Sequence, residues 1–122
     1  MNDSLCILVR RAPYGTIHAS EAFRHLVGTL SLGLKVIMIL VDDGVYMAKE
    51  YQRAETFGWT SLSKSLNAFL SSKNGQNIKV YIHNPSIKSR GMKKDQLIKR
   101  IELIDDKRLV EFLGTSYSVM LF

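Results

Sequence analysis

The chain has 122 residues, of which 46% are hydrophobic, and its formal net charge at pH 7 is +6. We expect residues 1–122 to form one domain, because a chain of this length buries a sizeable core without covalent staples. The longest aliphatic run, Val36 to Val41, is far shorter than the ~20 apolar residues of a membrane span. The first four residues lack a secretory pattern, and one cysteine excludes an internal disulfide or a paired-cysteine zinc site, so we expect a soluble cytoplasmic protein.

Short apolar strands alternate with helical segments along the whole sequence. The expected strands cover residues 5–9, 35–41, 78–82, 100–104 and 117–122. The expected helical segments, caps included, cover residues 16–33, 45–50, 59–74, 94–99 and 105–114. Thr16 is the expected N-cap of the first helix and Gly33 its stop, and Asp105 or Asp106 caps the last helix. Because parallel neighbours need crossover connections, this alternation predicts a three-layer α/β/α domain with a mostly parallel sheet of about five strands.

Polar residues follow the third expected strand, where His83-Asn84-Pro85-Ser86 is followed by Arg90-Gly91. Ligands and reacting groups gather at the carboxyl ends of the strands in an open α/β sheet, so His83 is the first candidate site residue. Its imidazole could act as a base, donate to an anion or bind a metal, or it could be a polar residue at a subunit contact. Asn84 and Ser86 could present backbone N–H groups to an anion, or one of them could simply cap a helix.

Three residues near other strand ends extend this candidate site. Asp43 could lie beside His83 and orient its ring, although an Asp before a helical stretch is most often an N-cap. Tyr14 could hydrogen-bond a ligand or pack against the domain, and Arg90 could pair with an anion or remain an exposed cation. The predicted ligand pocket consists of Tyr14, Asp43, His83, Asn84, Ser86 and Arg90.

Two other kinds of site receive little support. Cys6 lies inside an expected core strand with no local cation or helix N-terminus to activate its thiol, so it is predicted to be a packing residue. His18 and His25 are seven positions apart, which does not match the i, i+4 pair of a helical zinc site. No dinucleotide fingerprint follows any strand, and we expect neither a metal nor a cofactor.

Two segments suggest contacts with other molecules. The basic residues Lys88, Arg90, Lys93, Lys94, Lys99 and Arg100 are opposed only by Asp95, which indicates either an anionic partner or a solvated face. No aromatic residues interleave with these charges, which argues against nucleic acid and leaves an RNA-associated accessory role as a third hypothesis. The predicted interface consists of Tyr46, Met47, Tyr51, Phe57 and Trp59, some of which core packing would also explain.

Several segments, in this order, resemble the DsrE/DsrF-like family, which includes the TusB, TusC and TusD sulfur-relay proteins. They are the loop Ala12–Thr16, the strand and Asp-Gly-Val turn of Leu40–Tyr46, the third strand with Arg90-Gly91 beyond it, and the closing helix and strand that end at Phe122. The likeness covers nearly the whole chain and is closest to the TusC/DsrF branch. It implies a small α/β/α unit that assembles into trimers or hexamers.

The sulfur-carrying members of that family use a cysteine eight residues before the glycine of the Arg-Gly pair, and here that position is His83. The resemblance therefore implies a non-catalytic or accessory subunit of a sulfur-relay (persulfide transfer) system, and it favours a role without enzymatic activity. The implied partners are copies of the same chain or related family subunits, with a sulfur-carrier protein in addition and no membrane. The alternative is a small enzyme or ligand-binding protein that uses the pocket around His83 for an anionic ligand.

Overall fold

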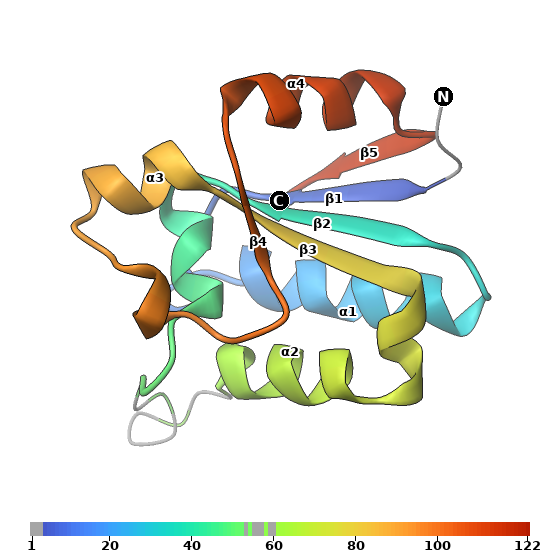
Figure 1. Ribbon diagram of the computed structural model, residues 1–122. Helices are drawn as coiled ribbons and strands as arrows, with labels where there is room; N and C mark the ends of the chain where they lie inside the picture. Colours follow the sequence, from blue (N-terminus) through green and yellow to red (C-terminus); the bar gives the residue numbers. More distant parts are fainter. Residues whose placement is uncertain (1–3, 53, 55–57, 59–60) are drawn as a thin grey trace.

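The computed structural model describes residues 4–52, 54, 58 and 61–122. Within these residues one sheet contains β1 (Leu5–Val9), β2 (Val36–Leu40), β3 (Ile78–His83), β4 (Glu102–Ile104) and β5 (Ser118–Leu121). The spatial order is β4-β3-β2-β1-β5, and every neighbouring pair is parallel (Figure 1). The predicted parallel sheet is therefore confirmed.

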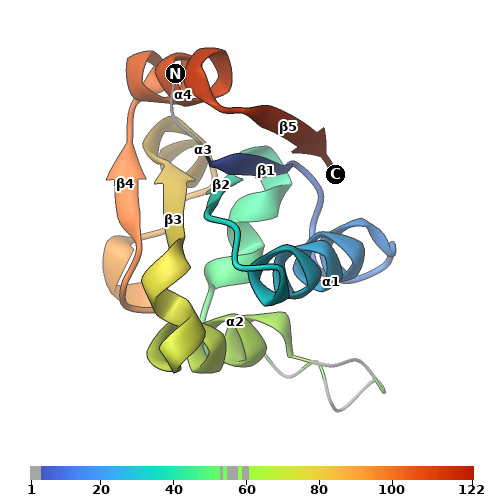
Figure 2. The same cartoon turned by 90° about the vertical axis from the view of Figure 1, so that its right-hand side faces the viewer.

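Helices cover both faces of this sheet. The helical segments are α1 (His18–Ser31), η1 (Asp42–Ala48), α2 (Leu62–Ser71), η3 (Lys73–Asn77), α3 (Asn84–Ser89), η4 (Lys94–Gln96) and α4 (Asp106–Thr115). Figures 1 and 2 show α1 and α2 against one face and α4 against the other. The three-layer α/β/α arrangement is as predicted. No helix in the described part of the chain is long and apolar enough to cross a bilayer.

The two faces of the sheet are covered unequally. Side chains of α1, α2 and η1 pack on one face in a large core that includes Leu26, Leu66 and Met38, all fully buried. The other face has a smaller cluster around Cys6, Ile39 and Tyr81, which only α4 covers among the described elements. Every residue of β2 is buried, because this central strand has packed side chains on both faces.

The local signals for helix ends were partly correct. Gly33 ends α1 as expected, with φ +79 and its N–H donating to the carbonyl of Leu30 at 3.0 Å. Asp105 caps α4 by accepting the N–H of Arg108 at 2.9 Å. The prediction of Thr16 as N-cap is wrong, because Ile17 holds that position and makes no side-chain capping bond.

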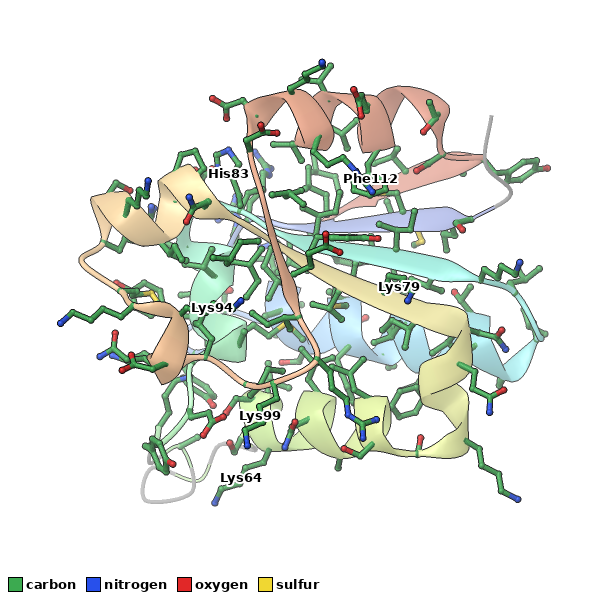
Figure 3. All side chains as sticks on the ribbon, in the orientation of Figure 1. Lys64, Lys79, His83, Lys94, Lys99 and Phe112 are labelled. Carbon is green, nitrogen blue, oxygen red and sulfur yellow. The ribbon has the colours of Figure 1, made fainter. Side chains whose placement is uncertain are left out.

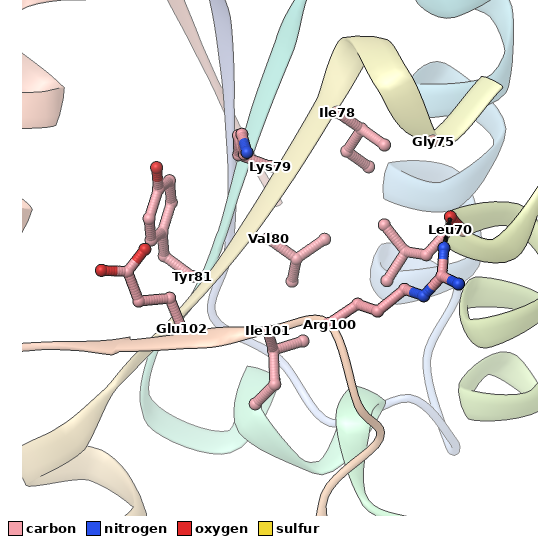
Figure 4. A pocket seen from close by; sticks show the side chains of 9 residues that line it. All are labelled: Leu70, Gly75, Ile78, Lys79, Val80, Tyr81, Arg100, Ile101 and Glu102. Carbon is pink, nitrogen blue, oxygen red and sulfur yellow. Dashed lines mark hydrogen bonds between the residues drawn. The ribbon is translucent and has the colours of Figure 1, made fainter. Parts of the chain in front are cut away.

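The fourth strand is shorter than predicted. It begins at Glu102 because Arg100 has φ +62, a left-handed conformation that cannot continue a strand. The helical turn expected over residues 94–99 is shorter in the structure, where it consists only of η4. The outer edge of β3 is therefore paired only from Tyr81 to His83. A pocket of about 340 Å³ lies beside its unpaired part, and there Arg100 Nη1 donates to the carbonyl of Leu70 at 3.0 Å (Figure 4).

Candidate functional site

His83 is the last residue of β3 and stands at the start of α3, so it lies at the carboxyl edge of the sheet as predicted. Its extended backbone, with φ −68 and ψ 110, makes it the N-cap residue of α3. The hypothesis that Asn84 or Ser86 caps a helix here is therefore wrong. Pro85 fits the first turn because a proline there loses no hydrogen bond.

The His83 side chain is held at both ring nitrogens. Nδ1 lies 2.6 Å from Oγ of Ser86, and Nε2 lies 2.6 Å from Oδ1 of Asp106 at the start of α4. Figure 3 shows the labelled His83 side chain below the start of α4. The Ser86 Oγ also accepts the backbone N–H of Asp42 at 2.9 Å. We call Asp42, His83, Ser86 and Asp106 the His83 cluster. It ties the end of β2 to α3 and α4.

One assignment of hydrogens satisfies every group of the His83 cluster. An ionised carboxylate only accepts, so Nε2 of His83 carries the proton that is donated to Asp106. Nδ1 then accepts from the hydroxyl of Ser86, whose oxygen is left to accept the N–H of Asp42. The cluster is thus a continuous chain of donors and acceptors.

The order carboxylate, imidazole, hydroxyl is that of a catalytic triad, but burial argues for a different role. Ser86 is only 4% exposed, and its Oγ is already engaged by both His83 and the backbone of Asp42. A catalytic serine must present its oxygen to a substrate. The His83 cluster therefore orients and fastens the strand ends, and offers no exposed nucleophile.

Among the described residues, no hydrogen bond or ion pair joins Asp43 to His83, so the structure does not show the ring-orienting contact that was predicted. Oδ1 of Asp43 instead accepts from Nε of Arg90 at 3.0 Å. Nη1 of Arg90 also donates to the carbonyl of Ser86 at 3.2 Å, so this arginine is bound at the end of α3. Asp43 is not an N-cap either, because Val41 holds that position before η1 and makes no side-chain capping bond.

Sequence reasoning missed Asp106, the carboxylate that does contact His83. A signal existed, since Asp106 follows the fourth expected strand, which also ends at the carboxyl edge. What the sequence did not supply was the pairing of β4 with β3, in which His83 stands beside Ile104. That pairing brings the start of α4 to the imidazole.

The backbone around Asp42 is unusually constrained. Asp42 has φ +50, a left-handed conformation that is uncommon outside glycine and is fixed here by the bond from its N–H to Ser86. Two residues later the chain passes close to the end of β1. A Cβ on Gly44 would lie 2.1 Å from the carbonyl oxygen of Val9, which requires a glycine at this position.

The residues predicted to line one ligand pocket lie at separate sites in the structure. Tyr14 and Asp43 do line one hollow of about 440 Å³ at the ends of β1 and β2, together with Arg10, Arg11, Ala12, Thr16 and Asp42. His83, Ser86 and Arg90 are not among its lining residues. Asn84 lines another groove of about 520 Å³ between β4 and α4. The Tyr14 hydroxyl also accepts the first N–H of α2, from Leu62, at 3.4 Å.

The residues predicted to form an interface differ in how far they are buried. Met47 is fully buried in the core of its own chain, so its assignment to an interface is wrong. Tyr46 is half-buried with the Lys49 ammonium 5.9 Å from its ring centre, whereas Tyr51 is 90% exposed. Phe57 and Trp59 lie outside the described residues.

Cys6 is fully buried on the α4 face of the sheet, as a packing residue would be. Burial raises the pKa of its thiol, and a hydrogen bond with Ser116 lowers it by less, so the pKa rises from 9.0 to about 11. The thiolate is therefore scarce at neutral pH. Among the described residues, no group of three or more His, Cys, Asp and Glu side chains is placed to hold a metal ion.

Comparison with known proteins places this chain in a group of relatives. It is 31% identical over 117 residues to an uncharacterized protein of Methanocaldococcus jannaschii, covering 95% of this chain and 96% of the relative. It is 26% identical to the intracellular sulfur oxidation protein DsrF of Allochromatium vinosum, covering 94% and 93%. A TusC homolog of Pseudomonas aeruginosa is also 26% identical, covering 93% and 92%.

A solved structure has the same fold. The crystal structure of the ychN protein from E. coli matches with a TM-score of 0.83 at 20% identity, covering 99% of this chain and 100% of that one. The model of the DsrE/DsrF-like family matches residues 3–122. This chain therefore belongs to the DsrE/DsrF-like family.

Proposed function

We propose that this protein is an accessory subunit of a sulfur-relay system that does not itself carry sulfur. Two relatives whose names refer to sulfur oxidation and to TusC support the process. The observation that carries the accessory role is at the end of β3. There the ring of His83 is held between Ser86 and Asp106, and no thiol stands at that position.

The chemistry of persulfide transfer explains why this matters. An acceptor thiolate attacks the outer sulfur of a donor R–S–SH, the bond between the two donor sulfurs breaks, and RS⁻ leaves while the acceptor becomes a persulfide. This step needs an accessible thiolate. Cys6 is fully buried and its pKa is raised to about 11, so it does not meet that requirement.

The role that fits such a chain is assembly in the cytoplasm. It would form a homo-oligomer, a trimer or hexamer, or join related family subunits that include a sulfur carrier. The His83 cluster would then keep the strand ends rigid beside the site of a neighbouring subunit. Its contacts join β2, α3 and α4, which is the part of the fold where a carrier would hold its cysteine.

Intact mass spectrometry after incubation with a small-molecule persulfide donor tests the absence of sulfur transfer. The wild-type chain is expected to gain no sulfur. His83→Cys is expected to gain the mass of one sulfur atom, and Cys6→Ala/His83→Cys to gain it equally. Ser89→Cys, an exposed position in α3, serves as the control for an ordinary surface thiol. A wild-type adduct that Cys6→Ala abolishes would overturn the proposal.

A second candidate function has one specific observation in its favour. The hollow at the ends of β1 and β2 has Arg10, Arg11 and the Tyr14 side chain in its lining, groups that can donate to a small anionic ligand. Asp42 and Asp43 also line it, so the ligand would have to bind at the two arginines and away from these carboxylates. His83 does not line this hollow, so the ligand would not meet the imidazole. Titration calorimetry with thiosulfate and with phosphate tests it: Arg10→Gln/Arg11→Gln is expected to weaken binding at least about tenfold, and Lys94→Gln to leave it unchanged. Absence of binding to the wild-type chain rejects this candidate.

A further inference from the structure

The two edges of the sheet differ in how they are protected. β4 forms one edge; it contains Glu102 and is flanked by the charged residues Arg100 and Asp105. β5 forms the other edge, and the sequence has no charged side chain from Phe112 to Phe122. Proteins usually guard an open edge with charge, proline or a bulge, because unpaired backbone groups invite another strand. The β5 edge has no charge and no proline.

Among the described residues, no strand pairs with the outer side of β5, where its backbone has further hydrogen-bonding groups. The N–H of Phe122 donates to Leu8 at 2.9 Å, and its carbonyl accepts from Arg10 at 2.8 Å, so both groups of Phe122 face β1. Successive residues of a strand point these groups in alternate directions. Val119 and Leu121 therefore direct their N–H and C=O groups away from β1, toward the open edge visible in Figure 2.

Apolar side chains accompany those backbone groups. Val119 pairs with Cys6 and Leu121 with Leu8, which places both on the α4 face of the sheet. They are 41% and 56% exposed, and Tyr117 just before them is 75% exposed. The edge thus combines outward-facing backbone groups with exposed apolar side chains.

We propose that this edge pairs with β5 of a second copy of the chain, antiparallel about a two-fold axis at Met120. This inference rests on the proposed assembly role and names the surface that carries it. Val119 of one copy would lie opposite Leu121 of the other, so that the outward backbone groups pair and the two apolar side chains touch. Self-pairing of this kind is isologous, because each copy contributes the same residues.

If two copies meet, charge favours contact at this edge over contact at the basic segment. Two molecules of net charge +6 repel each other, and a contact over the basic segment 88–100 would bring like charges together. In the proposed register no charged side chain of β5 lies opposite another, because residues 112–122 have none. A two-fold contact of this kind belongs to a dimer or to a hexamer made of two trimers, and does not occur in an isolated cyclic trimer.

Cysteine cross-linking tests the predicted register. In that register Met120 faces Met120 of the second copy as a non-hydrogen-bonded pair, with Cα atoms about 4.5 Å apart, which suits a disulfide. Met120→Cys is therefore expected to give covalent dimers under mild oxidation, and Cys6 does not compete because it is buried. Val110→Cys, 66% exposed on α4, is the control and is expected to remain mostly uncross-linked.

Sedimentation analysis with charge variants tests the contact itself. Val119→Lys/Leu121→Lys places like charges opposite each other and is expected to weaken self-association at least about tenfold, without unfolding, because both positions are exposed. Val119→Glu/Leu121→Glu is expected to dissociate likewise, and an equimolar mixture of the two variants to associate again. Val110→Lys is the control and is expected to leave association unchanged.

The outcomes separate this inference from the assembly proposal. A wild-type oligomer that is indifferent to the paired Lys variant, with no Met120→Cys cross-link, overturns the β5 contact and leaves assembly through another surface standing. A wild-type chain that remains monomeric at every concentration overturns the β5 contact and homo-oligomer formation together. In that case, co-purification with a related subunit would be the remaining support for an assembly role.

Discussion

Replacement of Ser86 by alanine perturbs the centre of the His83 cluster with a minimal change in volume. The hydroxyl of Ser86 serves two neighbours, accepting the N–H of Asp42 at 2.9 Å and contacting Nδ1 of His83 at 2.6 Å. Alanine keeps the buried Cβ and removes only the oxygen. The Asp42 N–H then loses its acceptor while the left-handed backbone conformation at this residue, φ +50, loses the bond that fixes it.

The expected loss of stability follows from these contacts. A buried donor left without an acceptor costs about 1–3 kcal/mol, and water reaches this site poorly because Ser86 is only 4% exposed. The lost contact with His83 adds to this cost, because Nδ1 then lacks its hydrogen-bond partner in a side chain that is only 14% exposed. We therefore expect Ser86→Ala to lower the free energy of unfolding by about 2 kcal/mol.

Urea denaturation followed by circular dichroism measures this change, with Ser89→Ala as the matched control. The Ser89 side chain is exposed; its hydroxyl donates to the carbonyl of Ser86 and accepts from Nη1 of Arg90, both at 3.0 Å. Water can replace this hydroxyl at an exposed position, so its removal is expected to cost less than about 0.5 kcal/mol. Both serines belong to α3, and therefore helix propensity cancels in the comparison. Equal stabilities of the two variants would refute the reasoning that the Ser86 hydroxyl fastens the end of β2.

Three further predictions concern single positions, and each is measured by urea denaturation. Asp42→Gly removes a side chain from a residue at φ +50 and is expected to raise the free energy of unfolding by about 0.5–1 kcal/mol; a loss of stability would mean that the Asp42 side chain matters more than the strain. Gly44→Ala forces a Cβ to within 2.1 Å of a carbonyl oxygen and is expected to cost about 2 kcal/mol or more, whereas Gly28→Ala, in an open helical position, is expected to be neutral or stabilising. The Cys6 pKa is raised from 9.0 to about 11, so the folded state holds the proton longer than the unfolded state. Its contribution to stability is complete below pH 9 and is lost toward pH 11 at roughly 1 kcal/mol per pH unit; Cys6→Ala should remove this part of the pH dependence, and an unchanged slope would contradict it.

Much of the fold could be predicted because its signals are local. The apolar runs at 5–9 and 78–82 are strands in the structure, since a buried parallel strand needs apolar side chains on both faces. Gly33 and Asp105 marked helix ends correctly, because each acts through its own backbone or its nearest turn. Errors arose where a residue had an unusual conformation, as Arg100 does with φ +62.

The candidate site was less predictable because it depends on contacts between residues that are far apart in the sequence. Placing His83, Asp43 and Arg90 at the carboxyl edge needed only the ends of the strands. The partners of these side chains depend on strand order and on the direction of each side chain. The contact between His83 and Asp106 joins residues 23 positions apart, and it exists because β4 lies beside β3.

The geometry of His83 also bears on how a carrier and an accessory subunit can share one fold. A thiol at position 83 cannot reach both Ser86 and Asp106, which the imidazole ring bridges through nitrogens on opposite sides. A cysteine here would be free to react, but it would leave the Asp106 carboxylate and the Ser86 hydroxyl without their present partner. A sulfur carrier needs the reactive thiol, whereas an assembly subunit would benefit from the imidazole that bridges Ser86 and Asp106. The single position at the end of β3 therefore sets reactivity against local order, and histidine gives this chain the ordered alternative.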